Sequence, residues 1–120
     1  MRLDTARRFA LSLPDTSEEP HFDMSSFRVH GKIFATVPPG GKHLHMHVDP
    51  AEGRALIEGS PATYEGIGRG TKIKSDWVRV NLPSADGAQV RELLEEAWRL
   101  KAPKRVLTAF DAERHDLRSS

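Results

Sequence analysis

Three histidines alternate with apolar residues in the segment 43–48, His-Leu-His-Met-His-Val. Successive side chains of a β-strand point to opposite faces, so this segment predicts a strand that presents His43, His45 and His47 together. Imidazoles placed in this way can bind a metal ion. A zinc site also needs further ligands and groups that orient the imidazoles, and simple hairpin pairing instead brings the ammonium of Lys32 near His47. We therefore predict that the histidines form a solvated face and that the protein has no cofactor. If the protein does bind a metal ion, His43, His45 and His47 are the candidate ligands.

A glycine-rich basic segment occupies residues 66–74, Gly-Ile-Gly-Arg-Gly-Thr-Lys-Ile-Lys. Its spacing differs from that of a phosphate-binding P-loop, and a strand is expected after it where a P-loop requires a helix. A basic loop beside a sheet edge can still contact backbone phosphates without reading base sequence. Arg69, Lys72 and Lys74 are therefore candidates for phosphate contact. The alternative is an ordinary mobile basic loop.

Carboxylates and a histidine gather in the segment 15–23, which contains Asp15, Glu18, Glu19, His21 and Asp23. Acid–base catalysis needs two titratable groups whose environments separate their pKa values, and nothing in this segment predicts burial. The serines lack the glycine-flanked turn of a serine hydrolase, and the chain has no cysteine. We expect a solvated acidic loop and a protein that is not an enzyme.

The segment 26–48 reads as three strands joined by two turns. Its apolar and polar residues alternate at 27–29 and at 43–48, and the segment 32–37 between them is apolar on both faces. His30-Gly31 predicts a two-residue turn because glycine accepts a positive φ. The prolines and glycines at 38–41 end the second strand, since proline cannot donate to a ladder.

Helical periodicity lies on both sides of this segment. An apolar stripe at 3–13 ends before Pro14, and Asp49-Pro50 predicts the start of a short helix that ends at Gly59. A longer helix, capped by Ser84 or Asp86, ends before Pro103. The remaining expectations are a loop at 66–70, a strand at 77–82, a short helix containing Val106, Leu107 and Phe110, and a flexible tail at 113–120.

Strand alternation also predicts two opposite sheet faces. The residues expected to face the helices are Ile33, Ala35, Val37, Leu44, Met46, Val48, Val78, Val80 and Leu82. The other face should collect Phe27, Lys32, Phe34, His43, His45, His47, Trp77 and Arg79. Aromatic and basic side chains together suit base stacking with phosphate contact. They suit a protein interface equally well, and a C-terminal segment folded over this face is a third possibility.

The composition fits one small folded domain. The chain has 120 residues, with 18 Lys and Arg against 17 Asp and Glu, so nucleic-acid binding requires separation of charge rather than net charge. No apolar run approaches membrane-spanning length and the first residues are not a signal peptide, so we expect a cytoplasmic protein. The domain should cover residues 1–112.

Several motifs resemble the MmcQ/YjbR family of small bacterial proteins, in the same order along nearly the whole chain. They are Phe9–Pro14, Glu18–Phe22, Ser26–Val29, Gly31–Ala35, Asp76–Val78 and Ala97–Arg105. The resemblance implies a two-layer α+β fold of the order α-β3-α-β2-α, similar to secretion chaperones, and a second strand within residues 60–75. Proteins of this family are usually described as DNA-binding, and the resemblance brings no catalytic residues with it.

These observations together predict a two-layer α+β domain with an antiparallel sheet backed by helices. The expected function is non-enzymatic binding of DNA through the phosphate backbone, by a monomer or a homodimer. The residues expected to make the contacts are Arg28, Lys32, Arg69, Lys72, Lys74, Trp77 and Arg79. The alternatives are a protein-interaction or dimerisation module that uses the same sheet face, and a small metal- or ligand-binding protein built on the histidine strand.

Overall fold

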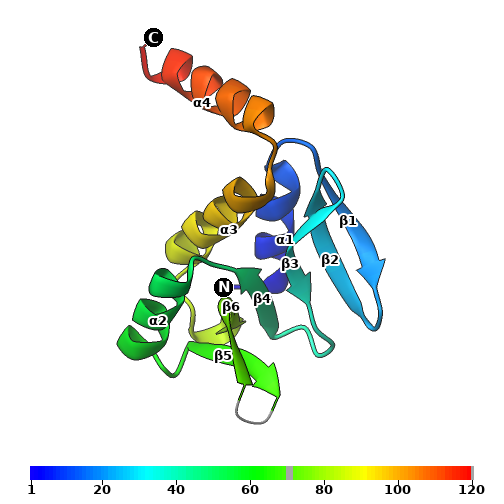
Figure 1. The fold of residues 1–120 in the computed structure, drawn as a ribbon, viewed down its shortest axis with the longest axis vertical. Coiled ribbons are helices and arrows are strands. Elements are labelled where there is room, and N and C mark those ends of the chain that lie inside the picture. Colours follow the sequence, from blue (N-terminus) through cyan, green and yellow to red (C-terminus); the bar gives the residue numbers. More distant parts are fainter. Residues whose placement is uncertain (70–71, 120) are drawn as a thin grey trace.

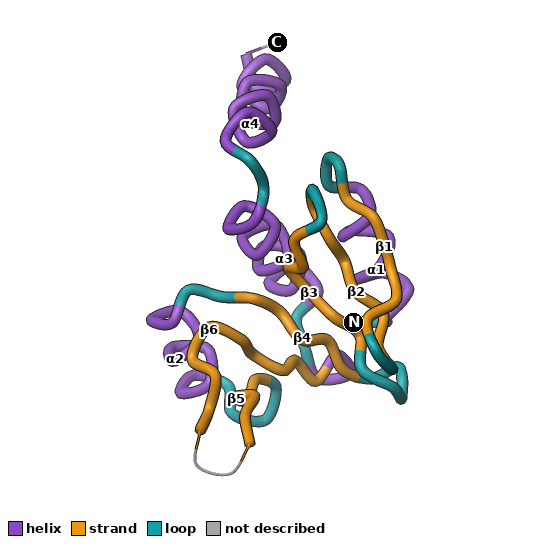
Figure 2. Tube along the Cα trace, turned by 45° about the vertical axis from the view of Figure 1, so that its right-hand side comes forward, coloured by secondary structure: helices purple, strands orange, loops and turns teal. Residues whose placement is uncertain are grey.

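Six antiparallel strands form one sheet in the spatial order β1-β2-β3-β4-β6-β5 (Figures 1 and 2). The structure is a computed structural model that describes the backbone of residues 1–69 and 72–119 and the side chains of residues 1–68 and 76–116. The elements are α1 (Leu3–Ser12), β1 (Thr16–His21), β2 (Met24–Val29), β3 (Lys32–Val37), β4 (His43–His47), α2 (Pro50–Gly59), β5 (Tyr64–Arg69), β6 (Lys72–Asn81), the 3-10 turn η1 (Leu82–Ser84), α3 (Gly87–Lys101) and α4 (Lys104–Ser119). The predicted α+β class, with an antiparallel sheet backed by helices, is confirmed.

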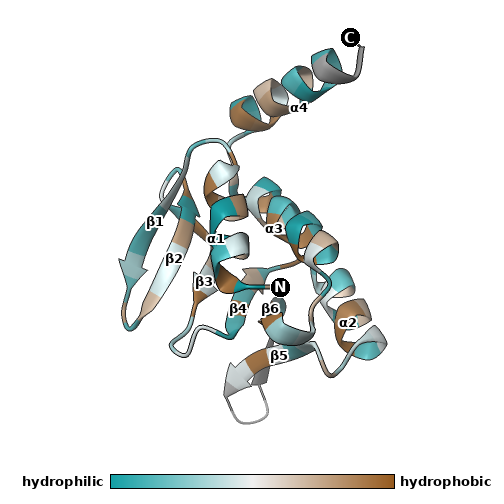
Figure 3. Ribbon diagram, turned by 180° about the vertical axis from the view of Figure 1, so that it is seen from behind, coloured by the Kyte–Doolittle hydropathy of each residue, from teal (hydrophilic) through white to brown (hydrophobic). Residues whose placement is uncertain are grey.

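The helical layer lies on one side of the sheet. Seen from behind, α1 and α3 lie in front of the strands, and α2 packs against β5 and β6 (Figure 3). The core between the layers holds Trp98, Leu93 and Leu94 of α3, together with the apolar side chains of the strands. Leu56 and Ile57 of α2 pack against the same core. Burial of this apolar surface is the main force that holds the two layers together.

The helix ends follow the capping residues that the sequence supplies. The Asp49 carboxylate accepts hydrogen bonds from the backbone N–H groups of Ala51 (3.1 Å) and Glu52 (3.4 Å), and Pro50 occupies the first turn of α2. The Asp86 carboxylate accepts from the N–H of Ala88 at 3.0 Å and so begins α3. These predicted starts are confirmed.

The segment predicted as an acidic loop is instead the edge strand β1. It pairs with β2 from Thr16↔Val29 to His21↔Met24, and the Ser26 hydroxyl donates to the Glu19 carbonyl at 2.7 Å. An edge strand tolerates proline, because one row of its backbone groups has no partner strand, and acidic side chains deter pairing with another chain. The loop prediction failed because proline and carboxylate residues are common both in edge strands and in loops, so their presence does not distinguish the two. The first run of strands therefore contains four strands, where three were expected.

The predicted loop at 66–70 is also wrong over its described part. Residues 64–69 form β5, which pairs with β6 on the far edge of the sheet. Between the pairs Gly66↔Val78 and Ile67↔Lys74 the register shifts, so β6 carries extra residues there as in a β-bulge, and the two strands stay paired on both sides of it. This strand is the second one that the family resemblance implied for the region.

A β-bulge in β3 overturns part of the predicted face assignment. Phe27 pairs with Ala35 whereas Arg28 pairs with Ile33, so Phe34 is an extra residue with no partner on β2. The bulge turns Phe34 into the core, where its ring centroid lies 6.5 Å from that of Phe27. Phe27 and Phe34 are therefore buried, contrary to prediction, and Ile33 pairs with Arg28 instead of facing the helices.

The last helix, α4, projects from one end of the molecule (Figure 1). It is helical as far as Ser119, through the segment predicted as a tail. The Phe110 ring packs on Trp98 at 5.0 Å, and Asp111 accepts a hydrogen bond from Arg99 at 2.6 Å, so α4 is attached to α3 and does not cover the sheet. Each helix in the described part of the chain is too short or too polar to span a bilayer.

Candidate nucleic-acid interface

The sheet face opposite α1 and α3 carries the side chains that the sequence singled out. One row across this face pairs Ser26 with Thr36, Thr36 with His45, His45 with Arg79, and Arg79 with Glu65. The neighbouring rows pair His43 with Asn81, His47 with Trp77 and Arg28 with Ile33. We call this surface the open face and define it by Arg28, His43, His45, His47, Glu65, Trp77 and Arg79.

Arg79 is the central cation of the open face. Its Nε lies 3.3 Å from Oε1 of Glu65, and its Nη2 lies 3.3 Å from Nδ1 of His43. The guanidinium thus lies between a carboxylate on one neighbouring strand and an imidazole on the other. Glu65 partly compensates the charge of Arg79. The pairing of these two residues depends on the register shift between β5 and β6, which no local sequence pattern predicts.

Two histidines of the open face, His45 and His47, lie in positions that favour the neutral imidazole. Burial, followed by the charge of Arg79, lowers the pKa of His45 below its ordinary value. Burial, followed by the charge of Lys101, lowers the pKa of His47, although Asp76 opposes this. Within the described part of the chain, His45 Nε2 and His47 Nδ1 are buried atoms without a hydrogen-bond partner.

The predicted neighbour of the histidines, Lys32, lies elsewhere. It pairs with Val29 at the His30-Gly31 turn, where Gly31 has the predicted positive φ (78°) and His30 also has a positive φ (49°). The cation that borders the histidines is Arg79 instead, since it pairs with His45 and contacts His43. In the regions where side chains are described, no three His, Asp or Glu residues are grouped as a metal site requires.

Trp77 and His47 form an aromatic pair on the open face. Their ring centroids lie 5.4 Å apart with an interplanar angle of 63°, which is an edge-to-face contact. Trp77 follows Asp76, whose carboxylate lies 3.8 Å from Nδ1 of His47, at the register shift between β5 and β6. Part of the indole stays exposed, so this pair offers an aromatic surface to a ligand.

Arg28 extends the basic surface toward β1. Its Nε donates to the Ser26 hydroxyl at 3.0 Å, and its Nη2 donates to the Pro20 carbonyl at 3.3 Å, so the guanidinium is positioned by neutral groups. The side chains of the other predicted contacts, Arg69, Lys72 and Lys74, lie outside the described residues. Their backbones belong to β5 and β6, where Arg69 pairs with Lys72.

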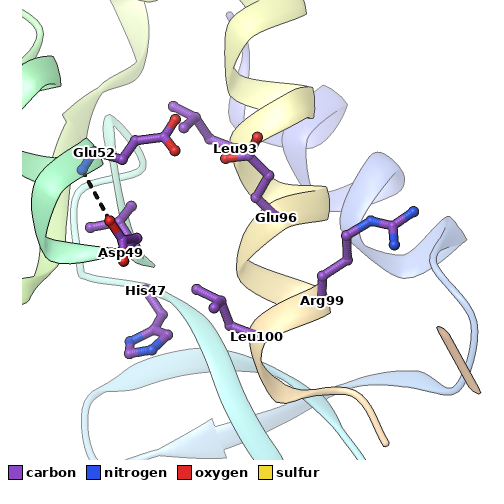
Figure 4. Close-up of a pocket in the computed structure, with 8 residues that line it drawn as sticks. His47, Asp49, Glu52, Leu93, Glu96, Arg99 and Leu100 are labelled. Atoms are coloured by element: carbon purple, nitrogen blue, oxygen red, sulfur yellow. Dashed lines mark hydrogen bonds between the residues drawn. The ribbon is translucent and has the colours of Figure 1, made fainter. Parts of the chain in front are cut away.

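A pocket that the sequence did not predict lies between α2 and α3 (Figure 4). Its volume is about 290 Å³, and it is lined by His47, Val48, Asp49, Glu52, Leu93, Glu96, Arg99 and Leu100. Burial, followed by the charge of Glu52, raises the pKa of Glu96 above its ordinary value. Neither carboxylate stands out in the sequence, because Glu52 reads as a first-turn residue of α2 and Glu96 as part of a solvated helix face.

Two solved structures share this fold. A protein of Deinococcus radiodurans, DR2400, described with the domain DUF419, superposes with a TM-score of 0.72 at 23% identity, covering 82% of this chain and 77% of that chain. A protein from Pseudomonas syringae superposes with a TM-score of 0.62 at 18% identity, covering 84% of this chain and 99% of that chain. At these identities the likeness concerns the fold.

No curated protein matches the chain. The family model described as YjbR matches residues 11–100, which include the sheet, α2 and most of α3. The resemblance inferred from the sequence motifs is thereby confirmed, and the chain belongs to the YjbR family.

Proposed function

We propose that the protein is a non-enzymatic nucleic-acid-binding module whose open face contacts DNA. The observation that carries the proposal is the placement of Arg79 beside the Trp77–His47 pair, with Arg28 farther across the same sheet face, which α1 and α3 leave uncovered. Cationic groups suit the phosphate backbone, and an exposed aromatic surface suits an unpaired base. This combination favours single-stranded DNA over a duplex, whose bases are already stacked.

The distribution of charge supports the proposal. The carboxylates Glu92, Glu95 and Glu96 belong to α3 in the helical layer, and Glu18 contacts Arg7 of α1, whereas Glu19 pairs with Ser26 at the β1 edge of the open face. On the open face as defined, Glu65 is the carboxylate, and its partner is Arg79. A nearly neutral chain can bind a polyanion when its charges separate in this way, because association depends on the local potential.

Each residue then has a separate role. Arg28 and Arg79 would neutralise phosphates and release condensed counterions, so affinity should fall linearly with salt concentration on logarithmic axes. Trp77 would stack on a base, which contributes about 1–3 kcal/mol per base in single-strand binding. When a phosphate binds Arg79, the Glu65 carboxylate would lose its ion pair with Arg79 and would repel the phosphate. Glu65 would therefore limit DNA affinity.

The test is fluorescence anisotropy with labelled single-stranded and double-stranded DNA over a salt series. We expect Arg28→Ala and Arg79→Ala to weaken binding of all sequences and to reduce the salt slope by about one each. Arg54→Ala is the matched control, because it removes the same charge from an exposed position on α2 in the helical layer. Reversal of Lys72 and Lys74 to Glu tests the β5–β6 hairpin in the same way.

Trp77→Ala tests the aromatic contribution and should weaken single-stranded binding more than duplex binding. Circular dichroism must first show that this variant is folded, because Trp77 also packs on His47. Absence of binding at low salt, or binding that is insensitive both to salt and to Arg79→Ala, would refute the nucleic-acid proposal.

A protein partner is the second candidate, and Phe22 is the observation that favours it. This residue is 92% exposed in the turn between β1 and β2, with a φ of 56° that is unusual for a bulky side chain. Large exposed aromatic side chains are typical anchors of protein interfaces. Light scattering coupled to size-exclusion chromatography, on the parent and on Phe22→Ser, would show whether such an anchor joins two copies of the chain.

A further inference from the structure

We propose that the groove between α2 and α3 binds a small organic cation, an apolar ring or chain that carries one ammonium group. The inference is independent of the proposed DNA contact, because the groove and the open face share only His47 among their defining residues.

Apolar side chains form the walls. Val48 at the end of β4 and Leu93 of α3 are buried in the core behind the groove, and Leu100 of α3 is 52% exposed beside it. An exposed leucine next to buried apolar walls offers surface that a ligand can remove from water, worth about 25 cal/mol for each Å² that is buried. An apolar body therefore fits this part of the groove.

Two carboxyl groups from different helices meet at the groove. Glu52 comes from the first turn of α2 and Glu96 from the middle of α3, and Figure 4 shows them on the same side of the groove. Burial, followed by the charge of Glu52 and a hydrogen bond with it, raises the pKa of Glu96, so Glu96 keeps its proton to a higher pH than an isolated carboxyl group. An ammonium group can replace that proton, because it donates to both carboxylates and removes the repulsion.

The other charged residues that line the groove already have partners. The Arg99 guanidinium donates to Asp111 at 2.6 Å and to Glu95 at 3.2 Å, and Figure 4 shows it pointing away from Glu52. The Asp49 carboxylate caps α2 by accepting from the N–H groups of Ala51 and Glu52. The charge left to the groove is therefore negative, and it selects a cation over a neutral molecule or an anion.

The size of the groove sets the size of the ligand. A closed apolar cavity of about 150 Å³ holds one benzene molecule, and this groove has a volume of about 290 Å³. It therefore has space for one ring with a short ammonium arm. Benzylamine is a suitable probe, with benzyl alcohol as its neutral counterpart and benzoate as its anionic counterpart.

The experiment is a titration of the full chain with each probe at pH 7.5, followed by amide NMR shifts and by calorimetry. We expect benzylamine to shift amides of α2 and α3 around the groove and to bind at least tenfold more tightly than benzyl alcohol. Glu96→Gln and Glu52→Gln should each weaken benzylamine binding about tenfold and leave benzyl alcohol unchanged, because each variant removes one charge-assisted hydrogen bond to the ammonium group. Glu58→Gln is the matched control, an exposed carboxylate on α2 that does not line the groove.

Proton release provides a second readout. The groups that face Glu96 are Glu52 from α2, Glu92, Glu95 and Arg99 from α3, and His47 and Asp49 at the groove. In a parallel titration at about pH 5, closer to the range in which a carboxyl group with a raised pKa takes up a proton, benzylamine should displace protons from Glu96, so its heat of binding should depend on the buffer's ionisation enthalpy in the parent and not in Glu96→Gln. Equal affinities for benzylamine and benzyl alcohol, shifts outside the groove, or unchanged binding in Glu96→Gln would each overturn the proposal.

Discussion

The indole of Trp98 donates a hydrogen bond from Nε1 to the backbone carbonyl of Pro14, at 3.0 Å. Trp98 lies near the C-terminal end of α3, and Pro14 follows the C-terminal end of α1, so this bond joins the ends of two helices that are far apart in the sequence. The same ring is fully buried and contacts Phe110 of α4 edge-to-face. One side chain thus connects three helices to the core.

Trp98→Phe should destabilise the protein by about 1–3 kcal/mol, the usual cost when a hydrogen-bond acceptor loses its partner in a largely buried site. The phenyl ring retains much of the packing, so the fold itself should persist. Urea denaturation measures the change, and Trp77→Phe on the open face is the matched control with a smaller expected effect. A midpoint equal to that of the parent would show that water replaces the lost donor.

Leu94→Ala should cost about 2–5 kcal/mol, because the side chain is fully buried under the sheet and its removal leaves a cavity. Leu100→Ala is the control on the same helix, since that leucine is half-exposed and its truncation should cost under about 1 kcal/mol. The measurement is again the midpoint of urea denaturation, compared between variants whose free energies of unfolding depend equally steeply on urea concentration. Similar losses in the two variants would contradict the assigned positions of these residues.

The sequence predicted most of the fold because its signals were local. The Asp49 cap, the His30-Gly31 turn and the alternation of residues 43–48 each depend on neighbours in the chain, and each is confirmed. Membership of the YjbR family was also predictable, because the motifs run in order along nearly the whole chain.

The failed predictions concern relationships between strands. Alternation placed Phe34 opposite Ala35, but the extra residue in β3 puts both in the core, and only the register with β2 reveals this. Pro20 and its acidic neighbours suggested a loop, although an edge strand has the same composition. Likewise, Glu65 meets Arg79, and Glu52 meets Glu96, through contacts between elements that no local pattern encodes.

Zinc should bind weakly to the histidine strand. Arg79 pairs with His45 and lies 3.3 Å from His43, so a dication at these imidazoles would meet a guanidinium. Calorimetric titration of zinc into chelator-treated protein should therefore show no stoichiometric submicromolar site. Tight binding that His45→Ala abolishes would contradict this prediction and support a metal-binding protein. Arg79→Ala tests the cause, because removal of the guanidinium should strengthen zinc binding.

Stability should fall as the pH drops below about 6.5, because the pKa values of His45 and His47 are lowered in the folded protein. Above pH 6.5 both imidazoles are neutral in the folded and unfolded chains, so they give no pH dependence. Between pH 6.5 and the lowered pKa values of the folded protein, the unfolded chain binds protons at these imidazoles and the folded chain does not. The free energy of unfolding therefore decreases over this pH range. Glu96 acts in the opposite direction at lower pH, since its pKa is raised in the folded protein and protonation there favours folding.

The experiment compares urea midpoints at pH 7.5 and 5.5 for the parent and for His45→Gln/His47→Gln. Glutamine keeps a polar side chain at each site and cannot titrate, so the difference between the two midpoints should shrink in the double variant. His21→Gln serves as the control, since His21 lies in β1 at its turn with β2 and outside the open face. An equal pH dependence in the parent and the double variant would show that groups other than His45 and His47 cause the loss of stability. If the DNA proposal also holds, DNA affinity should rise only at still lower pH, where the imidazoles of the folded protein take up protons and add positive charge beside Arg79.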